Sequence, residues 1–211
     1  MNLATQLRDG LADLGLEMSA GMQSKLLGYV ALLKKWNQTY NLTAVRDESE
    51  MVTHHLLDSL SVLPALQEQV LVGRRWADVG SGAGLPGIPL AIARPDLHMT
   101  LIEAVEKKSA FQRQAKIELG LSNVTVACGR VEEMPGGSFD AVVSRAFAEL
   151  AIFVELAGHL LASKGRLYAM KGQAPEEETG RLPSGWTVRD RTRLSVPGLD
   201  AQRHLIVLER V

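Results

Sequence analysis

The sequence lacks the features of a disulfide-bonded, zinc-stapled or membrane-spanning protein. Its 211 residues include one cysteine, which excludes a disulfide framework and leaves no cysteine pair for structural zinc. No apolar run approaches membrane-spanning length, and the N-terminal stretch "MNLATQLRDGLADLGLEM" carries charges where a signal peptide needs an apolar core. We therefore expect a soluble, cytoplasmic protein that does not associate with membranes.

The chain also lacks an excess of charge of one sign, because 23 lysine and arginine residues stand against 24 acidic residues. A neutral total excludes a global polycation but still allows a basic face, so charge alone identifies no partner. Internal repeats, low-complexity tracts and long linkers are also absent. The length allows one domain with a full core, with or without a small appendage, and a monomer is the default expectation.

Apolar residues recur at helical spacing in the first 70 residues, without any strand pattern. Three groups, at 3–14, 22–33 and 52–63, predict three helices. The polar, amide-rich stretch 36–49 predicts a loop, with Asp47 or Ser49 capping the helix that follows. Residues 1–70 are therefore expected to form an N-terminal helical segment, followed by a domain at 71–211. Whether this segment packs on that domain stays open.

From residue 75 the pattern changes to short apolar or alternating runs separated by amphipathic stretches. It predicts seven strands, at 75–79, 98–102, 123–127, 139–143, 165–170, 187–196 and 203–210. Helical patterns separate the first five, at 85–94, 107–119, 130–134 and 148–162. They imply right-handed crossovers and a mostly parallel α/β sheet covered on both faces. Only "PGLDAQ" joins the last two strands, which predicts an antiparallel hairpin.

Four glycines lie among residues 80–87, in the turn after the first predicted strand. They are Gly80, Gly82, Gly84 and Gly87. A turn without Cβ atoms lets a ligand lie against the backbone, and free amides at the next helix face any negative group. Asp78 adds a carboxylate beside the turn, and Glu103 ends the second strand, where an acid can bind both ribose hydroxyls. The pattern predicts a site for a nucleoside-containing cofactor.

Two cofactors compete for this turn. Gly82, Gly84 and Gly87 satisfy the dinucleotide fingerprint, so a nicotinamide-dependent oxidoreductase is one alternative. A Walker A loop is excluded, because no Lys-Ser or Lys-Thr follows the glycines. The carboxylate of Asp78 suits an ammonium or sulfonium better than a pyrophosphate. The closing hairpin also replaces the second half that a dinucleotide fold needs, and both arguments favour S-adenosylmethionine.

A more specific likeness extends over nearly the whole chain. It rests on the stretches "WNQTYNLTAVRD", "HHLLDSL", "DVGSGAGLPGIPLAI", "GRVEEM", "VVSRAFAEL", "YAMKGQ" and "DAQRHLIVLE". These stretches closely resemble class I S-adenosylmethionine-dependent methyltransferases, which have a Rossmann-like sheet. More narrowly, they resemble the bacterial small-subunit ribosomal RNA guanine-N7 methyltransferase family, also called glucose-inhibited division protein B. The resemblance implies methyl transfer to a guanine N7 of small-subunit ribosomal RNA, with S-adenosylhomocysteine as the other product.

The resemblance also implies residue roles. Gly80 to Leu85 would line the methionine part of the cofactor, Glu103 would hold the ribose, and Val131 and Glu132 would flank the adenine. Arg145, the one catalytic residue implied, would lie beside both the cofactor and the guanine. With the strand-end acid, the expected cofactor-binding set is Asp78, Gly80, Gly82, Gly84, Leu85, Glu103, Val131, Glu132 and Arg145.

The residues after the fourth strand agree with N7 chemistry. They read "SRAF", without the Asn-Pro-Pro-Tyr type motif of amino-group methylation. Cytosine C5 methylation needs a nucleophilic cysteine, but Cys128 ends the third strand, where a buried apolar role is expected. Guanine N7 carries a free lone pair and needs no general base. Arg145 either binds guanine O6 or a phosphate, or pairs with an acid at the rim.

RNA binding requires phosphate contacts and a base drawn out of its stack. The residues expected to contact RNA are Asn37, Asn41, Arg46, Lys171, Arg203 and His204. Trp36 and Tyr40 either stack on a base or pack in the core, and arginines of the last hairpin either bind phosphate or guard an edge strand. His54, His55 and Asp58 do not predict a metal site, because adjacent histidines point to different sides of a helix. A non-catalytic RNA-binding module and a small-molecule methyltransferase remain alternatives.

Overall fold

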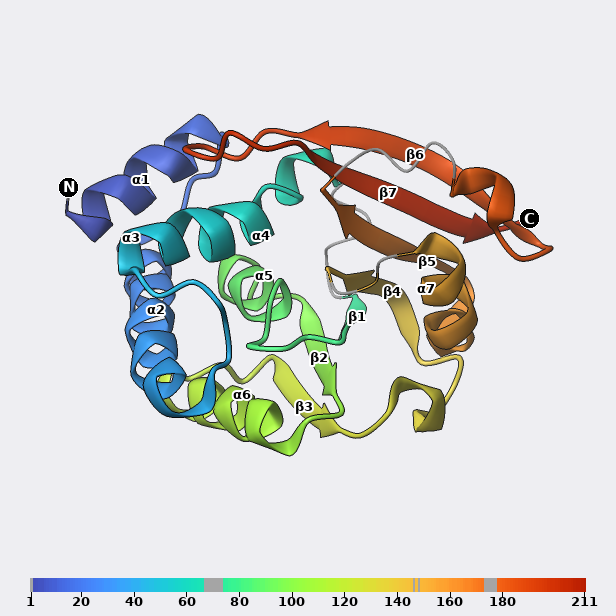
Figure 1. Cartoon of the computed structure of the whole chain (residues 1–211), viewed down its shortest axis with the longest axis horizontal. Coiled ribbons are helices and arrows are strands. Elements are labelled where there is room, and N and C mark those ends of the chain that lie inside the picture. Colours follow the sequence, from blue (N-terminus) through green and yellow to red (C-terminus); the bar gives the residue numbers. More distant parts are fainter. Residues whose placement is uncertain (1, 67–73, 146, 148, 173–177) are drawn as a thin grey trace.

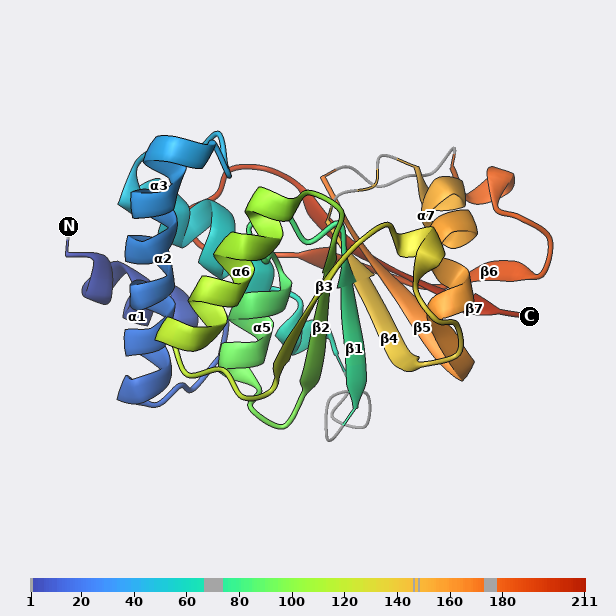
Figure 2. The same cartoon turned by 90° about the horizontal axis from the view of Figure 1, so that it is seen from below.

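A single sheet organises the chain. The structure, a computed structural model, describes residues 2–66, 74–145, 147, 149–172 and 178–211. Among these residues, seven strands form one sheet in the order β3-β2-β1-β4-β5-β7-β6, with helices on both faces (Figure 1, Figure 2). The strands are β1 (Arg75–Val79), β2 (His98–Glu103), β3 (Val124–Cys128), β4 (Phe139–Ser144), β5 (Leu161–Lys171), β6 (Trp186–Leu194) and β7 (Arg203–Arg210).

The pairing of the strands places the site. The first five strands are parallel, while β7 pairs antiparallel with both β5 and β6. The predicted α/β sheet with a closing hairpin is therefore confirmed. The strand order reverses between β1 and β4, and ligands of such sheets bind at the carboxyl ends of the strands beside this reversal. The glycine turn follows β1 at that point.

The predicted end of the fourth crossover helix is wrong. Helix α7 (Leu150–Ala157) gives way to a short 3-10 turn, η5 (Gly158–Leu160), and β5 already begins at Leu161. Leu161 pairs with Phe139, after which the register shifts. Gly165 lies at this irregularity, where a Cβ atom would stand 2.9 Å from the Phe139 carbonyl oxygen. Tertiary pairing therefore overrides the helical pattern of residues 158–162.

The N-terminal part is helical, as predicted. It contains α1 (Leu3–Asp13), α2 (Ala20–Tyr40), α3 (Glu48–Met51), the π-helix η1 (Val52–Leu57), α4 (Asp58–Leu60) and η2 (Leu63–Ala65). Asp47 caps α3, because its side chain accepts from the amides of Ser49 and Glu50. The loop predicted at 36–49 is wrong for its first five residues, since α2 continues to Tyr40 and ends at Asn41 with φ 49°.

Helices α5 (Gly87–Ala93) and α6 (Glu106–Glu118) cover the same face of the sheet as the N-terminal helices (Figure 2). One apolar cluster includes Leu33 and Leu56 from the N-terminal part together with Trp76 and Leu101 from the sheet. A second cluster, with Phe153, lies between α7 and the other face. The N-terminal helices therefore share a core with the sheet; the boundary predicted between residues 70 and 71 lies outside the described residues.

A buried hydrogen bond ties α2 to the glycine turn. The Tyr29 hydroxyl donates to the carbonyl oxygen of Ala83 over 2.7 Å. Tyr29 is fully buried, and burial raises the pKa of its hydroxyl, so it keeps its proton and remains a donor. This bond fixes the middle of the turn from the N-terminal side.

We expect Tyr29→Phe to lower the free energy of unfolding by about 1–3 kcal/mol, because the Ala83 carbonyl would be left buried without its donor. Tyr40→Phe is the matched control, since Tyr40 lies on the same helix and is 40% exposed. Urea denaturation of both variants measures the difference. Equal stability of the two variants would show that the hydroxyl does not tie α2 to the turn.

Candidate cofactor and substrate site

The glycine turn between β1 and α5 has a backbone that other residues rarely adopt. Gly80, Gly82 and Gly84 have φ values of 66°, 57° and 84°. A Cβ atom on Gly84 would overlap the side chain of Ile88, whereas one on Gly82 would meet nothing nearer than the Gly80 carbonyl at 4.0 Å. Gly84 therefore faces the core, and Gly82 presents bare backbone to open space, as a ligand cradle requires.

Glu103, at the end of β2, holds the open side of this turn. It is 6% exposed, and its Oε2 accepts the amide of Gly82 over 2.8 Å. Its Oε1 accepts the amide of Val105 over 2.9 Å. Each carboxylate oxygen keeps a second lone pair, so the group can still accept hydroxyl donors from a ribose.

Gln112 is a site residue that the sequence analysis missed. It lies fully buried on α6, and its Nε2 donates over 2.8 Å to both the Ser81 hydroxyl and the Gly82 carbonyl. The available signal was a polar amide beside Phe111 on the apolar face of the predicted helix 107–119. Gln112 therefore fixes the turn from the side of α6.

Asp78 lies beneath the turn and not at its open face. It is fully buried, and its Oδ2 accepts the amide of Gly87, the first residue of α5, over 2.7 Å. Within the described residues its Oδ1 has no hydrogen-bond partner. Burial raises the pKa of this carboxyl from 3.8 to about 7, although the Gly87 amide and Arg145 oppose the rise. Asp78 anchors α5 against the turn.

A cavity of about 200 Å³ opens beside the turn. Its lining combines residues that were predicted to bind the cofactor, among them Leu85 and Arg145, with three residues of the N-terminal part that were not predicted to bind it. Its lining residues are Leu42, Thr43, His55, Gly80, Ser81, Gly82, Ala83, Leu85 and Arg145. Thr43 Oγ1 lies 2.9 Å from His55 Nε2, and burial lowers the pKa of His55 to about 4, so the imidazole is neutral at pH 7.

A second cavity, of about 350 Å³, shares His55 and Arg145 with the first. It gathers Lys171 and Arg203, both predicted to contact RNA, although they come from different strands. The lining residues are His54, His55, Asp58, Arg145, Met170, Lys171, Gly172 and Arg203. We call these two spaces the first and the second cavity. His204 follows Arg203 on β7, where it pairs in register with Lys171.

Asp58 at the second cavity pairs with arginines and not with a histidine. Its Oδ2 lies 2.8 Å from Arg145 Nη1, and its Oδ1 lies 2.8 Å from Arg203 Nε. Arg145 thus both pairs with an acid at the rim and borders the glycine turn. Across the described residues, no group of three or more His, Cys, Asp or Glu side chains is placed to hold a metal ion.

Val131 and Glu132, expected beside the adenine, form part of a 3-10 turn, η4 (Val131–Glu133), after β3. Val131 is partly buried and Glu132 is exposed. The burial predicted for Cys128 is wrong: the residue is exposed, and its thiol donates to Glu106 over 2.8 Å. The physical reason is that β3 is an edge strand, so its last residue lies at the rim of the sheet.

The last turn of α2 and the loop that follows it carry the other residues expected to contact RNA. Asn37 is only 2% exposed, and its amide bonds to the Val45 carbonyl and the Thr43 amide. Asn41 and Arg46 are exposed and bonded to each other over 2.8 Å. Asn37 therefore shapes the loop from inside, while Asn41 and Arg46 lie on its surface.

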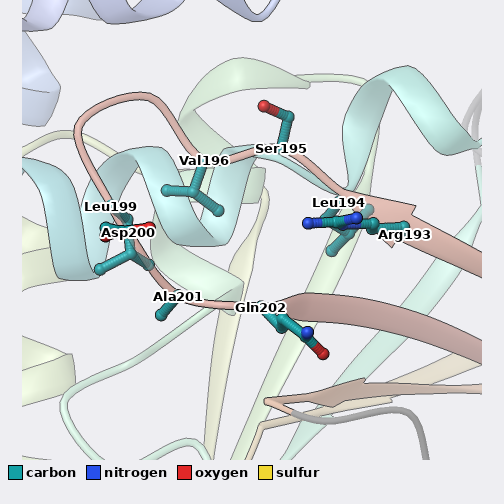
Figure 3. Close-up of a pocket in the computed structure, with 8 residues that line it drawn as sticks. All are labelled: Arg193, Leu194, Ser195, Val196, Leu199, Asp200, Ala201 and Gln202. Carbon is teal, nitrogen blue, oxygen red and sulfur yellow. The ribbon is translucent and has the colours of Figure 1, made fainter.

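A third cavity, of about 550 Å³, has no residue of the glycine turn in its lining. It is lined by the end of β6 and by the connection from β6 to β7 (Figure 3), which reaches Thr53 of η1 near Gly198. Arg193 of the last hairpin lines it, but none of the expected cofactor-binding residues and none of Asn37, Asn41, Arg46, Lys171, Arg203 and His204 does. Size alone therefore does not identify the site, which we assign to the first and second cavities.

The raised pKa of Asp78 predicts a pH dependence of stability. The folded protein binds this proton more tightly than the unfolded chain, so Asp78 costs stability as the pH rises from about 4 to about 7. We expect the stability of Asp78→Asn relative to the native protein to rise over that range, by up to about 4 kcal/mol. Urea denaturation at several pH values measures it, with Asp13→Asn at the exposed end of α1 as control. Parallel curves for all three proteins would contradict the proton assignment.

Within the described residues, no helix is long and apolar enough to cross a membrane. Solved structures similar to this chain share its fold at low sequence identity. A SAM-dependent methyltransferase from Aquifex aeolicus has a TM-score of 0.58 at 20% identity, covering 77% of this chain and 93% of that one. TrmN from Thermus thermophilus has a TM-score of 0.55 at 20% identity, covering 76% and 53%. These likenesses concern the fold alone.

Sequence relatives are much closer. The sequence model of the family described as rRNA small subunit methyltransferase G, GidB, matches residues 22–206. The protein named ribosomal RNA small subunit methyltransferase G from Azoarcus sp. (strain BH72) is 54% identical to this chain, over 98% of this chain and 96% of the relative. Another in Aromatoleum aromaticum is 56% identical, over 98% and 99%. The chain therefore belongs to the rRNA small subunit methyltransferase G family.

Proposed function

We propose that this protein transfers a methyl group from S-adenosylmethionine to N7 of a guanine in small-subunit ribosomal RNA. The observation that carries the proposal is that two unlike cavities share His55 and Arg145 as lining residues. The first contains bare glycine backbone, and the second contains Lys171 and Arg203. A cofactor on one side and an anionic strand on the other would meet at Arg145.

The cofactor side of the proposal rests on the glycine turn. Gly82 leaves room for the methionine part, which Leu85 would border, and Glu103 has lone pairs for the ribose hydroxyls. Val131 and Glu132 would flank the adenine at the end of β3. Bound there, the cofactor would supply an electrophilic methyl group on a sulfonium.

The protonation states of the first cavity suit N7 as the acceptor. Its ionisable lining residues are Arg145 and His55, and the lowered pKa of His55, about 4, makes it a poor base at pH 7. An exocyclic amine would need help in losing a proton, whereas N7 attacks through a free lone pair. The protein's task is then to align the guanine, exclude water and donate hydrogen bonds from Arg145.

The RNA side of the proposal rests on the second cavity and the loop after α2. Lys171 and Arg203 would bind phosphates near the target base, with His204 beside them, while Asn41 and Arg46 would meet the strand farther out. Asn37 would act by holding the loop, because its buried amide already bonds to the backbone. We propose that the enzyme works in the cytoplasm as a monomer.

The direct test is transfer of labelled methyl from S-adenosylmethionine to small ribosomal subunits that lack the modification. Borohydride and aniline treatment then cleaves the RNA at N7-methylguanine. We expect one new cleavage site in the small-subunit RNA. Label without cleavage would overturn the N7 assignment, and no label despite cofactor binding would favour the RNA-binding module. Activity that does not depend on RNA would indicate a small-molecule methyltransferase. Binding of NADH, with no binding of S-adenosylmethionine, would indicate an oxidoreductase.

We expect Gly82→Val to abolish cofactor binding, because the side chain would fill the cradle. Glu103→Ala should weaken binding by about 1–3 kcal/mol through loss of a charged acceptor. Gly15→Val is the matched control, since Gly15 has a similar φ of 68° and open space around it but lines neither cavity of the site. Isothermal titration calorimetry measures the affinities. Native affinity in both site variants would remove the site assignment.

A further inference from the structure

We propose that Asp58 is a positioning residue, which holds Arg145 and Arg203 at the second cavity so that both guanidinium groups bind one phosphodiester beside the target guanine. This inference rests on the proposed function and adds a residue to its site. The sequence analysis assigns Asp58 no role in binding the cofactor or the RNA.

The first observation is that Asp58 is buried where two segments distant in the sequence reach it. It is the first residue of α4 and is 1% exposed. Arg145 lies just after β4 and Arg203 begins β7, and these two strands flank β5 in the sheet. Each arginine has its own carboxylate oxygen, at 2.8 Å in both cases. One buried side chain thus sets the separation of two guanidinium groups.

The second observation is the π-helix that precedes Asp58. Arg145 Nη1 donates to the carbonyl oxygen of His54 over 3.1 Å as well as to Asp58. His54 lies within η1, and π-helical turns occur frequently at functional sites. Arg145 is therefore held by two acceptors of one helical segment, which fixes its orientation and not only its charge.

The third observation concerns the hydrogen-bond donors of the two arginines that remain available to a ligand. Arg203 uses Nε for Asp58 and Nη1 for the Gln202 carbonyl, and Arg145 uses Nη1. Within the part of the chain that the structure describes, neither Nη2 group makes a hydrogen bond. Both arginine side chains line the second cavity and are about a quarter exposed, at 27% and 26%. These donors can receive an anion without breaking the pairs to Asp58.

Charge also favours a single phosphodiester. One carboxylate against two guanidinium groups leaves one positive charge in the Asp58 cluster, which equals the charge of one phosphodiester in magnitude. Lys171 adds a cation at the same cavity, but it already lies 3.0 Å from Glu178. If the two arginines act only through their charge, removal of the Asp58 carboxylate should raise the affinity for RNA and leave kcat unchanged. If Asp58 positions them, its removal should lower kcat.

This opposition defines the test. Asp58→Asn keeps the shape of the side chain but removes its charge, so that charge alone would tighten RNA binding. If Asp58 positions the arginines, kcat for methyl transfer to small subunits falls by roughly 10- to 100-fold, as misplacement of reactants predicts. The affinity for RNA stays the same or increases, and the affinity for S-adenosylmethionine stays unchanged. Single-turnover rates, RNA binding and calorimetry on the full chain separate these terms.

Glu209→Gln is the matched control. Glu209 also bridges two arginines, Arg166 at 3.0 Å and Arg189 at 2.9 Å, but none of the three lines either cavity of the site. It should leave kcat unchanged. Native kcat in Asp58→Asn, or an equal loss in Glu209→Gln, would overturn the inference. An unlabelled substrate with the native protein would instead overturn the proposed function.

A second variant keeps the inference testable if Asp58→Asn does not fold. Arg203→Lys retains the positive charge but loses the planar group that bonds to Asp58 through Nε. We expect its kcat to fall while its RNA affinity and the salt dependence of RNA binding stay native. Native kcat together with native RNA affinity would show that Arg203 contributes charge alone, and would contradict positioning by Asp58.

Discussion

The glycine turn must be held from outside, because its four glycines supply no side chains. Its positive φ values are compatible with a ligand lying on the backbone, but the glycines that adopt them contribute no side-chain packing to the turn. Buried polar groups from four other elements replace that packing: Tyr29 on α2, Asp78 on β1, Glu103 on β2 and Gln112 on α6. The shape of the candidate cofactor site therefore depends on hydrogen bonds from distant parts of the chain.

This dependence makes the N-terminal helices part of the site. Tyr29 contacts the turn, Thr43 and His55 form a wall of the first cavity, and Asp58 forms a wall of the second. The π-helix η1 borders both cavities, since it contains His54 and His55. A movement of η1 would change the cofactor side and the substrate side together, because the two cavities share this segment.

The sequence predicts most of what is local. The strands, the turn, Glu103 and the Asp47 cap follow from patterns within a few residues, and each is found near its expected place, with β5 starting four residues earlier than predicted. The roles of Tyr29, Gln112 and Asp58 could not be predicted, because each depends on a partner 30 or more residues away. Element ends failed for the same reason: Trp36 packs on Phe111 of another helix, at 5.7 Å between ring centroids, and extends α2 into the predicted loop.

The two roles considered for Arg145, pairing with an acid and facing the substrate, support each other under the proposed chemistry. Methylation at N7 gives the purine a positive charge, which an unpaired arginine nearby would oppose. With Asp58 at 2.8 Å, Arg145 offers hydrogen-bond donors while part of its charge is offset by a carboxylate that it shares with Arg203. Under the proposed function, this acid at the rim would let an arginine lie beside a base that becomes cationic, so the pairing would serve the reaction as well as the fold.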